Sequence, residues 1–474
     1  MKGKRALVMG LGLNGGGLAS AVYLARAGCF VTVTDLRGEA ALAPSIAALE
    51  TALAARGGAV PPVRYVLGEH RPRDFAEADL VIKNPAVRRD SPFLAAARHV
   101  ETDISLFLKD TAPLGLRIVA VTGSKGKSGT ASAIHWGLEP LARAEGRGAW
   151  LGGNITVSPL SFAEQLGPRD YVVLELSSWQ LGDLRGRGLL KPRVAVVTAI
   201  MPDHQDYYHS MEAYVADKKV ICEAQDAGDA LIAQDDIWGR QFLEAGRGRP
   251  IPCGDSAPPP GQSGGWLDAA GAGMARLCGG PFGTGEAREV VPARPLLPGP
   301  HQKRNLLAAA LALLDLGAAA PEIRERLGAF PGIEHRLECF LERGGVRFYN
   351  DSAATIPEAA AAAIAAFREP LVLVSGGTDK ALDFAPLARA AASAKKVILL
   401  AGTGSEKLRR LLEAAGTPFE GPFDRVEAAA QALLRAAAPG DVALFSPGCT
   451  SFGMFQNEFD RGRRWKETLL HAEF

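Results

Sequence analysis

Short apolar, β-branched runs alternate with Ala- and Leu-rich amphipathic stretches from one end of the chain to the other. This alternation is typical of parallel strands joined through helices in α/β layers, so we predict an α/β fold. The runs predicted as strands are residues 6–9, 31–34, 80–83, 118–122, 171–176, 194–199, 230–233, 346–349, 371–375, 396–401 and 442–446.

The chain length of 474 residues corresponds to about three domains of ordinary size. We place a link between the first and second blocks at 111–116, and the third block follows Pro331. Residues 254–288 are rich in Gly, Pro, Ala and Ser, which bury too little apolar surface to offset chain entropy. We therefore predict turns and loops there, with room for a short hairpin.

The charge balance excludes some classes of partner. Lys plus Arg number 53 and Asp plus Glu 52, so no net field favours nucleic acid or an anionic membrane surface. The six cysteines are scattered without zinc-like spacing, as expected of reduced thiols. Neither a signal-peptide pattern nor an apolar run of 18 residues is present, so we expect a soluble, cytoplasmic protein.

A glycine- and lysine-rich turn lies between the apolar run 118–122 and a helical stretch at 131–138. Such a turn presents backbone N–H groups and a helix N-terminus to phosphates. Lys127 is then placed for the β- and γ-phosphate oxygens and Ser128 for Mg²⁺, although Val121 stands where the general motif has glycine. The alternative is a purely structural turn. The candidate residues are Gly123, Ser124, Lys125, Gly126, Lys127, Ser128 and Gly129.

A second glycine-rich turn, residues 10–17, follows the first predicted strand, and Asp35 ends the next one. This spacing is typical of dinucleotide-binding folds, in which the acid accepts a hydrogen bond from a ribose or base. The residues alone leave three possibilities open: a nicotinamide cofactor, a different nucleotide, or a structural turn.

Polar residues also follow strands in the second block. Glu175 closes the run 171–176, where an acid beside a phosphate loop can hold Mg²⁺ or simply cap a helix. His204 follows the run 194–199, as a site residue or an ordinary loop histidine. Lys218 and Lys219 lie in a predicted helix, 213–224, where solvation explains both equally well. His301 and Asn305 share one face of a later helix.

Three polar turns follow strands in the third block, at 350–352, 376–380 and 446–451. The carboxyl ends of parallel strands meet at one edge of a sheet, so these turns can build one small-molecule site. Lys380 suits a carboxylate ligand, although a surface lysine is the simpler explanation.

Taken together, these motifs resemble the Mur ligase family, most closely its MurD type, which adds glutamate to UDP-N-acetylmuramoyl-L-alanine. The resemblance covers nearly the whole chain and rests on the order of the motifs. The matching segments are GSKGKS at 123–128, GGNI at 152–155, ELSSWQL from Glu175, DH at 203–204, YVADK ending in Lys218, HQKRN from His301, EHR ending in Arg336, NDS at 350–352, GGTDKALDF from Gly376 and SPGCTSFGMF from Ser446.

The resemblance implies roles for matching residues. The catalytic set would be Lys127, Lys218, His204 and Glu175, with metal held by Ser128, Glu175, His204 and Lys218. ATP would contact residues 123–129 together with Asn305, Arg336 and Asp351. The UDP substrate would contact Gly12, Leu13, Asn14, Gly15, Asp35, Asn154, Ser177 and Ser178. The incoming glutamate would contact Thr355, Lys380 and Ser451.

The resemblance also implies an organisation and a chemistry. It predicts a Rossmann-like UDP-substrate domain at 1–112, a central P-loop-type ATPase domain at 113–330, and a Rossmann-like glutamate domain at 331–474. ATP, two Mg²⁺ ions and a carbamylated Lys218 would support an acyl-phosphate route to the amide in peptidoglycan precursor synthesis. We expect a monomer whose partners are small molecules, not nucleic acid or membrane.

Some positions depart from the pattern of the resembled family. Ala353, Ile356 and Gln302 replace residues common there, and Glu458 aligns with a phenylalanine that lines the amino-acid pocket. Three of these four changes lie in the third block, so L-glutamate remains an alternative to the favoured D-glutamate. A nicotinamide-dependent dehydrogenase, suggested by the first glycine turn alone, is a more remote alternative, as are a non-catalytic nucleotide-binding protein and a folate polyglutamate ligase.

Overall fold

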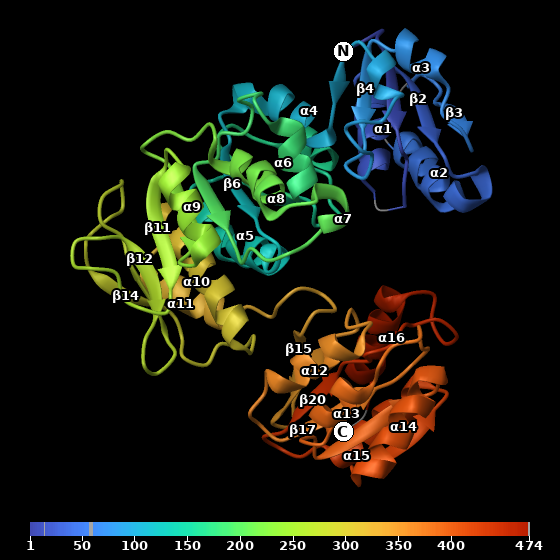
Figure 1. The fold of residues 1–474 in the computed structure, drawn as a ribbon, viewed down its shortest axis with the longest axis vertical. Helices are drawn as coiled ribbons and strands as arrows, with labels where there is room; N and C mark the ends of the chain where they lie inside the picture. Colours follow the sequence, from blue (N-terminus) through green and yellow to red (C-terminus); the bar gives the residue numbers. More distant parts are fainter. Residues whose placement is uncertain (14, 56–59, 473–474) are drawn as a thin grey trace. The chain divides into compact units, whose positions relative to one another are not determined.

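The computed structural model describes residues 1–13, 15–55 and 60–472, and its strands form three sheets that follow one another along the chain (Figure 1). The first sheet has the order β3-β2-β1-β4-β5, and all its strand pairs are parallel. Its strands are β1 (Arg5–Met9), β2 (Phe30–Asp35), β3 (Arg64–Leu67), β4 (Leu80–Lys83) and β5 (Val100–Glu101), and its helices are α1 (Gly16–Arg26), α2 (Glu39–Ala54), α3 (Pro72–Glu77) and α4 (Asp103–Thr111).

The second sheet has the order β14-β13-β12-β11-β10-β9-β6-β8-β7. Pairing is parallel from β12 through to β7, whereas β12 and β13 pair antiparallel. The strands are β6 (Arg117–Thr122), β7 (Ala149–Gly153), β8 (Tyr171–Glu175), β9 (Val194–Val197), β10 (Ala230–Gln234), β11 (Arg249–Gly254), β12 (Gly264–Leu267), β13 (Gly273–Arg276) and β14 (Ala287–Val291).

The helices of this middle region carry Lys127, Ser128, Gly129, Ser178, Lys218 and Asn305 of the candidate site. They are α5 (Lys127–Ala144), α6 (Ser178–Leu184), α7 (Gln205–Tyr208), α8 (Met211–Lys218), α9 (Ile237–Ala245), α10 (Pro300–Asp315) and α11 (Ala320–Gly328). Gly137 of α5 packs so tightly against α10 that a Cβ there would lie 2.3 Å from Leu313 Cδ1. The absence of a side chain thus lets α5, which begins at the phosphate loop, approach α10 closely.

The third sheet has the order β15-β16-β20-β17-β18-β19, with only β15 antiparallel among the pairs. Its strands are β15 (Glu338–Arg343), β16 (Val346–Asn350), β17 (Leu371–Ser375), β18 (Lys396–Leu400), β19 (Phe419–Phe423) and β20 (Val442–Phe445). Its helices are α12 (Pro357–Ala365), α13 (Ala385–Ala391), α14 (Thr403–Ala415), α15 (Val426–Ala436) and α16 (Glu458–Leu470). Because β16, β20 and β17 are neighbours, the turns that follow them meet at one edge.

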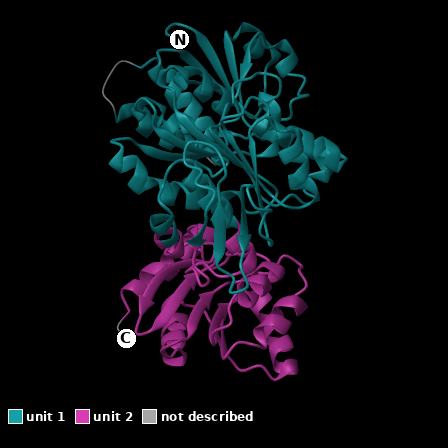
Figure 2. Cartoon of the chain, turned by 90° about the vertical axis from the view of Figure 1, so that its left-hand side faces the viewer, with its two compact units in different colours: residues 1–290, 305–324 teal, residues 291–304, 325–474 magenta. Residues whose placement is uncertain are grey.

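The chain forms two compact units (Figure 2). Residues 1–290 and 305–324 make up the first, and residues 291–304 and 325–474 make up the second. The first unit holds the first two sheets, apart from Val291 at the end of β14.

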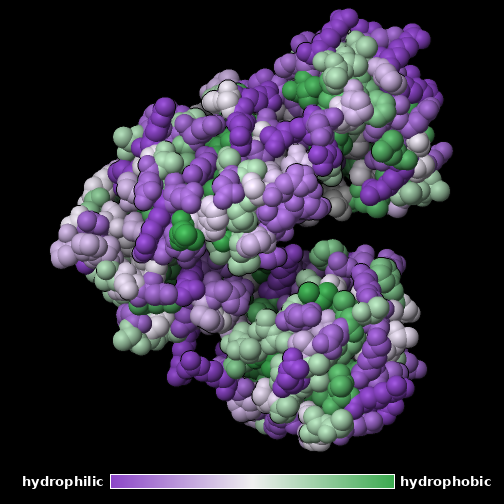
Figure 3. All heavy atoms as spheres, in the orientation of Figure 1, coloured by the Kyte–Doolittle hydropathy of each residue, from purple (hydrophilic) through white to green (hydrophobic). Residues whose placement is uncertain are grey.

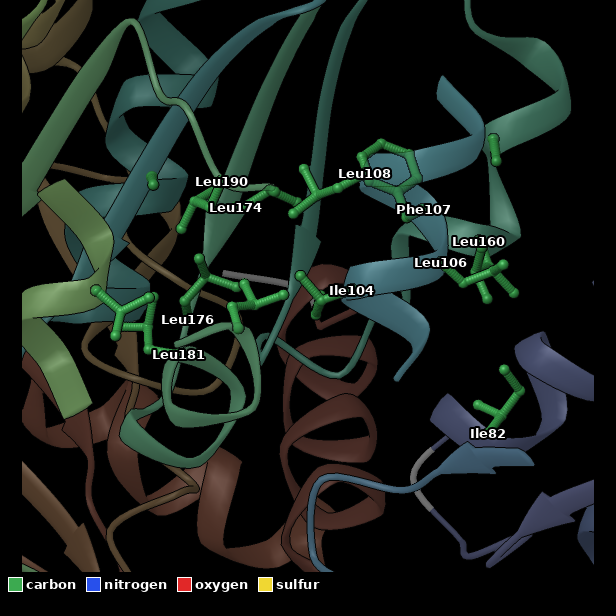
Figure 4. Close-up of a cluster of buried hydrophobic side chains, with 14 of the residues drawn as sticks. Ile82, Ile104, Leu106, Phe107, Leu108, Leu160, Leu174, Leu176, Leu181 and Leu190 are labelled. Carbon is green, nitrogen blue, oxygen red and sulfur yellow. The ribbon is translucent and has the colours of Figure 1, made fainter. Parts of the chain in front are cut away.

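One apolar cluster explains why the first two sheets share a unit. It includes Val8 and Ile82 from the first sheet together with Val172 and Leu231 from the second. Figure 4 shows Phe107 and its α4 neighbours close to leucines of the middle region. Burial of this surface ties the two sheets together, because apolar area removed from water stabilises by roughly 25 cal/mol per Å².

The surface is mixed, as the charge balance suggests. Figure 3 shows hydrophobic residues interspersed among hydrophilic ones on the face drawn. All six cysteines are free thiols. Within the described ranges, no helix is both long and apolar enough to cross a membrane.

The predicted α/β class is confirmed, and each predicted strand overlaps an observed one. The segment 254–288 contains the predicted hairpin as β12 and β13, and it also contains the beginning of β14. The predicted helix 213–224 is instead α8 followed by a 3₁₀ turn, Lys219–Cys222.

Candidate active site

The phosphate-loop motif forms the turn between β6 and α5, as expected. Gly126 caps the helix in the left-handed region at φ +89, a conformation that glycine adopts without strain. Gly123 lies against β9, where a Cβ would come within 2.0 Å of Thr198 Oγ1. The Thr198 hydroxyl in turn lies 2.7 Å from the carbonyl oxygen of Lys125, to which it donates. The turn is therefore held from behind by the neighbouring strand end.

Ser124 anchors the middle of this loop. Its backbone N–H donates to the carbonyl of Ala199 at 2.8 Å, and its hydroxyl lies 2.9 Å from the Tyr214 hydroxyl. Lys127 Nζ donates to the Ser124 carbonyl at 3.0 Å. Of the remaining loop residues, Lys125 is exposed, whereas Ser128 and Gly129 are half-buried in the first turn of α5. This arrangement offers helix N–H groups, a lysine and a serine to a phosphate chain.

Lys218 reaches the loop from the end of α8. Its side chain is almost fully buried, its Nζ donates to the Gly123 carbonyl at 2.9 Å, and it lies 4.6 Å above the Tyr214 ring centre. Burial, reinforced by the nearby charge of Lys127, lowers the pKa of Lys218 to about 7. Lys219 instead donates to Gln241 Oε1 at 3.4 Å. Geometry thus distinguishes two lysines that the sequence leaves equivalent.

Glu175 ends β8, next to the loop-bearing strand β6. Its Oε1 accepts a hydrogen bond from Asn154 Nδ2 at 3.0 Å, so the Asn154 side chain is engaged with Glu175. Its Oε2 is buried without a hydrogen-bond partner among the described residues. A buried carboxylate oxygen left unsatisfied is costly, and a cation is the natural partner for it.

His204 lies at the start of α7 with φ +51, a left-handed conformation that is uncommon outside glycine. Its ring centre is 4.8 Å from that of Trp179, and its Nε2 is 3.9 Å from Asp203 Oδ2. Backbone strain of this kind often accompanies functional sites. The side chain remains 43% exposed, so it is open to a ligand.

Glu175 and His204 fit a magnesium ion that is held mainly by phosphate oxygens. Among the described residues, no three His, Cys, Asp or Glu side chains cluster as metal ligands. Mg²⁺ needs only one or two protein ligands when water and substrate phosphates complete its octahedron. The unpartnered oxygen of Glu175, near the phosphate loop, meets that requirement.

Asn305 of α10 closes the other side of the loop. A Cβ added to Gly126 would lie 2.5 Å from Asn305 Oδ1, so the two residues are in close contact. The helix 300–315 begins at Pro300 as predicted, and places Asn305 beside the turn at Gly126.

The first glycine turn is organised by Asp35. This acid is buried at the end of β2, and its carboxylate accepts from the N–H groups of Gly12 at 3.1 Å and Arg37 at 2.9 Å. Gly15 caps α1 at φ +86, and Leu13 is exposed. Asn14 lies outside the described residues. The Asp35 carboxylate thus holds Gly12 of this turn against the end of β2.

Ser177 and Ser178 begin α6. Ser177 caps it reciprocally with Gln180, its hydroxyl accepting from the Gln180 N–H at 3.3 Å while Gln180 Oε1 accepts from the Ser177 N–H at 3.0 Å. Ser178 is buried. The local hydrogen bonds give Ser177 a structural role in addition to the substrate contact that we predicted.

A cavity of about 150 Å³ lies beside Trp179, between the first sheet and α6. Its lining includes the basic residues Lys83, Arg88 and Arg89 and the acidic residues Asp183 and Asp206. Arg89 also donates to the Gly182 carbonyl at 2.9 Å and pairs with the buried Asp217. None of these basic residues is singled out by a motif, because they come together only through tertiary packing.

In the second unit, the three polar turns meet as predicted. Thr378 and Thr450 exchange backbone hydrogen bonds at 3.1 Å, joining the turn after β17 to the turn after β20. Asp351, after β16, accepts from the Ser446 hydroxyl at 2.7 Å. Ser451 is buried, and Lys380 is exposed with its Nζ 5.8 Å from the Phe452 ring centre.

The remaining predicted residues lie close to these turns. Burial raises the pKa of Asp351 to about 7, although hydrogen bonds from Ser446 and the Leu337 N–H oppose the shift. Arg336 is exposed two residues before β15, and Thr355 is half-buried just before α12. Residues 335–337 and 350–352 therefore form one polar corner.

Two family models match the chain. "Mur ligase middle domain" matches residues 121–255, which contain the phosphate loop, Glu175, His204 and Lys218. "Mur ligase, glutamate ligase domain" matches residues 335–449, which contain most of the three polar turns.

Curated relatives match over almost the entire chain. A UDP-N-acetylmuramoylalanine–D-glutamate ligase from Treponema pallidum is 41% identical, with 99% of this chain and 98% of that protein covered. A protein of the same name from Roseiflexus is 40% identical, with 99% of each covered.

A solved structure is similar in fold. The UDP-N-acetylmuramate-alanine ligase MurC from Thermotoga maritima aligns with a TM-score of 0.55 at 17% identity, covering 99% of this chain and 100% of that one. At this level of identity the likeness concerns the fold alone.

Proposed function

This chain belongs to the Mur ligase family, and from that premise we propose that it joins D-glutamate to UDP-N-acetylmuramoyl-L-alanine while ATP is converted to ADP and phosphate. The observation that carries the proposal is the set of Lys127, Glu175, His204 and Lys218 around one phosphate loop, in a chain whose near-full-length relatives are named for this reaction. The product is a precursor of peptidoglycan.

The first step activates the alanine carboxylate, which is otherwise a poor electrophile. One carboxylate oxygen attacks the γ-phosphorus of ATP, the bond to the β,γ-bridging oxygen breaks, and ADP leaves with that electron pair. Catalysis of phosphoryl transfer is mainly positioning and charge neutralisation. Lys127 and the N–H groups at the start of α5 supply both.

The second step forms the amide. The glutamate amine attacks the acyl carbon, a tetrahedral intermediate forms, and phosphate leaves while the amine loses a proton. We assign Thr355, Lys380 and Ser451 to holding glutamate, supported by the meeting of their turns at one edge of the third sheet. Fixed cationic and N–H groups stabilise charge that develops on the leaving oxygens.

Two Mg²⁺ ions would be held by Ser128, Glu175, His204 and Lys218. When bound, they supply charge neutralisation for the phosphate oxygens. The unpartnered Oε2 of Glu175 supports this assignment. Lys218 would act as a carbamate, because a lysine whose pKa is about 7 has a large neutral fraction that can react with CO₂.

We assign the nucleotide of ATP to residues 123–129, Asn305, Arg336 and Asp351. The UDP substrate is assigned to the turn at Gly12, Leu13, Asn14 and Gly15, to Asp35, and to Asn154, Ser177 and Ser178. The cavity beside Trp179, lined by both basic and acidic side chains, gives the substrate a concave surface on this side of the first unit.

The domain boundaries that we propose are 1–112, 113–330 and 331–474. They are supported by the confinement of the three sheets to residues 5–101, 117–291 and 338–445. We further propose a monomer that works in the cytoplasm, where ATP and UDP-linked precursors are available.

L-Glutamate is not favoured, because the near-full-length relatives are named for the D-isomer. The nicotinamide alternative is not favoured either, since it explains neither the phosphate loop nor the match to the glutamate ligase model.

The test is ADP release by the purified protein with ATP, Mg²⁺ and UDP-N-acetylmuramoyl-L-alanine, with either D- or L-glutamate. We expect release to depend on D-glutamate, with a product heavier than the acceptor by one glutamyl residue. Release with L-glutamate alone would overturn the stereochemistry, and no release with either would overturn the function.

A further inference from the structure

Arg461 of α16 is fully buried at 0% exposure, although arginine is almost never buried without an ionic partner. None of the described carboxylates forms an ion pair with it, and its guanidinium contacts only neutral oxygens. Burial lowers the pKa of Arg461 to about 10, so it remains charged at neutral pH. Burying an unpaired charge is strongly unfavourable, so this arrangement calls for a compensating role.

The guanidinium donates hydrogen bonds to two of the three polar turns of the second unit and lies beside the third. Its Nε donates to Ser352 Oγ at 3.0 Å and its Nη2 to the Ser352 carbonyl at 2.7 Å. Its Nη1 donates to the Cys449 carbonyl at 3.0 Å, and a Cβ on Gly377 would lie 3.6 Å from the same nitrogen. One planar group therefore ties the turn after β16 to the turn after β20 and packs next to the turn after β17.

We propose that Arg461 is a positioning residue for the glutamate site, holding the turns that carry Thr355, Lys380 and Ser451 in register. The inference rests on the proposed function of those turns. Arg461 also supplies a second positive charge besides that of Lys380. A substrate with two carboxylates is attracted by both charges.

The contacts explain why arginine is needed. Lysine keeps the charge, but it has a single nitrogen and cannot span Ser352 and Cys449 with the fixed fork of a guanidinium. Arg461→Lys therefore tests the positioning, and Arg461→Gln removes the charge as well. Arg464, one turn further along α16, is exposed and contacts Met454 and Phe455. Arg464→Gln is the matched control.

The measurement is twofold. Steady-state kinetics give KM for D-glutamate, ATP and the UDP substrate, and calorimetry gives D-glutamate binding in the presence of a non-hydrolysable ATP analogue and the UDP substrate. We expect Arg461→Lys to raise both the KM and the calorimetric Kd for D-glutamate about tenfold, corresponding to about 1.4 kcal/mol. KM for ATP should change less than about twofold. Arg461→Gln should bind D-glutamate more weakly still, and Arg464→Gln should have the KM and Kd of the wild type.

The binding arm separates this inference from the proposed function. Wild-type protein that binds D-glutamate without turnover would refute the ligase assignment, while the Arg461 variants still report on positioning. The positioning role would be overturned if Arg461→Lys bound D-glutamate as tightly as the wild type. It would also be overturned if KM rose equally for all three substrates. If neither Arg461 variant folds, Ser352→Ala decides. It removes the Nε acceptor and the hydrogen bond that the Ser352 hydroxyl donates to the Glu458 carbonyl, while the Ser352 carbonyl stays in place. An unchanged glutamate affinity in that variant would overturn the proposal.

Discussion

Burial and charge act together on the residues around the phosphate loop. Lys218 is surrounded by protein, so its ammonium form loses hydration, and the charge of Lys127 adds repulsion. Glu175 shows the opposite situation, a buried carboxylate with one oxygen left for a cation. Burial thus disfavours the ammonium form of Lys218 and leaves a carboxylate oxygen of Glu175 in need of a cation.

The lowered pKa of Lys218 predicts a pH dependence. Below a pH of about 7 the amine is protonated and cannot add CO₂, so we expect kcat to fall as the pH decreases through 7 and carbamate to disappear from ¹³C NMR spectra. Lys218→Ala should lower kcat by about 100-fold or more. Lys219→Ala, at the neighbouring lysine that contacts Gln241, should behave like the wild type. A kcat that stays constant down to pH 6 would contradict this prediction.

The free Oε2 of Glu175 predicts a separation of activity from stability. Glu175→Gln keeps the shape and removes the charge, so we expect the Mg²⁺ concentration for half-maximal rate to rise about tenfold or more. The free energy of unfolding should stay the same or increase, because an unsatisfied buried carboxylate is lost. Mg²⁺ titrations and urea unfolding measure the two effects. Glu164→Gln, near Arg26, is the control, and an unchanged Mg²⁺ requirement for Glu175→Gln would exclude the metal role.

At the scale of elements, the sequence predicts the central strands well and the outer ones poorly. Residues 171–174 form a continuous apolar run, as expected of β8, a strand that is buried on both faces. In contrast, β11 contains Pro250 and Pro252, and β12 begins with two glycines, so neither has a strand-like pattern. Such strands form because the growing sheet offers them partners, a tertiary effect that local sequence does not encode.

The site shows the same division. Motifs identified the phosphate loop and the three polar turns, because turn chemistry is local. Thr198 and Arg461 support those turns from distant positions and lie outside the motifs, so sequence reasoning missed them. Tyr214 lies within the YVADK segment, but its contact with Ser124 was not predicted. From sequence, only the family resemblance favours Lys218 over Lys219. In the structure, Lys218 reaches the phosphate loop whereas Lys219 contacts Gln241.

The helix entrance at Gly126 predicts a matched pair of glycine variants. Gly126→Ala adds a Cβ at φ +89 that would clash with Asn305, so KM for ATP should rise about tenfold or more. Gly146→Ala, just beyond the other end of α5, meets no atom within 4 Å at φ +66. It should lower stability by about 1 kcal/mol without changing KM for ATP. Equal KM values for the two variants would contradict the role assigned to the loop.

At the scale of the whole molecule, buried ion pairs link the first sheet to the middle region. Lys83 Nζ at the end of β4 lies 2.8 Å from Asp183 Oδ2 of α6, and both side chains are about 5% exposed or less. Glu101 of β5 pairs with Arg187 beyond α6. These contacts add specificity to a boundary that is mostly apolar.

Removal of one partner should therefore destabilise the first unit. We expect Asp183→Asn to lower its free energy of unfolding by about 3 kcal/mol, because Lys83 is left buried without its counter-charge. Lys83→Met combined with Asp183→Leu should recover most of the loss. Urea unfolding measures both. If Lys83→Met/Asp183→Leu were as unstable as Asp183→Asn, the instability would not come from the unpaired charge of Lys83.

The shared apolar cluster sets a limit on how this protein could be recombined. Ile104 and Phe107 of α4 precede residue 112, yet they pack among leucines of the middle region (Figure 4). A chimaera joined at residue 112 would lose Ile104 and Phe107 from the shared core and leave an apolar cavity in the middle region. Residues 1–112 are thus not separable from the second sheet, and a transferable piece of this protein has to contain both sheets.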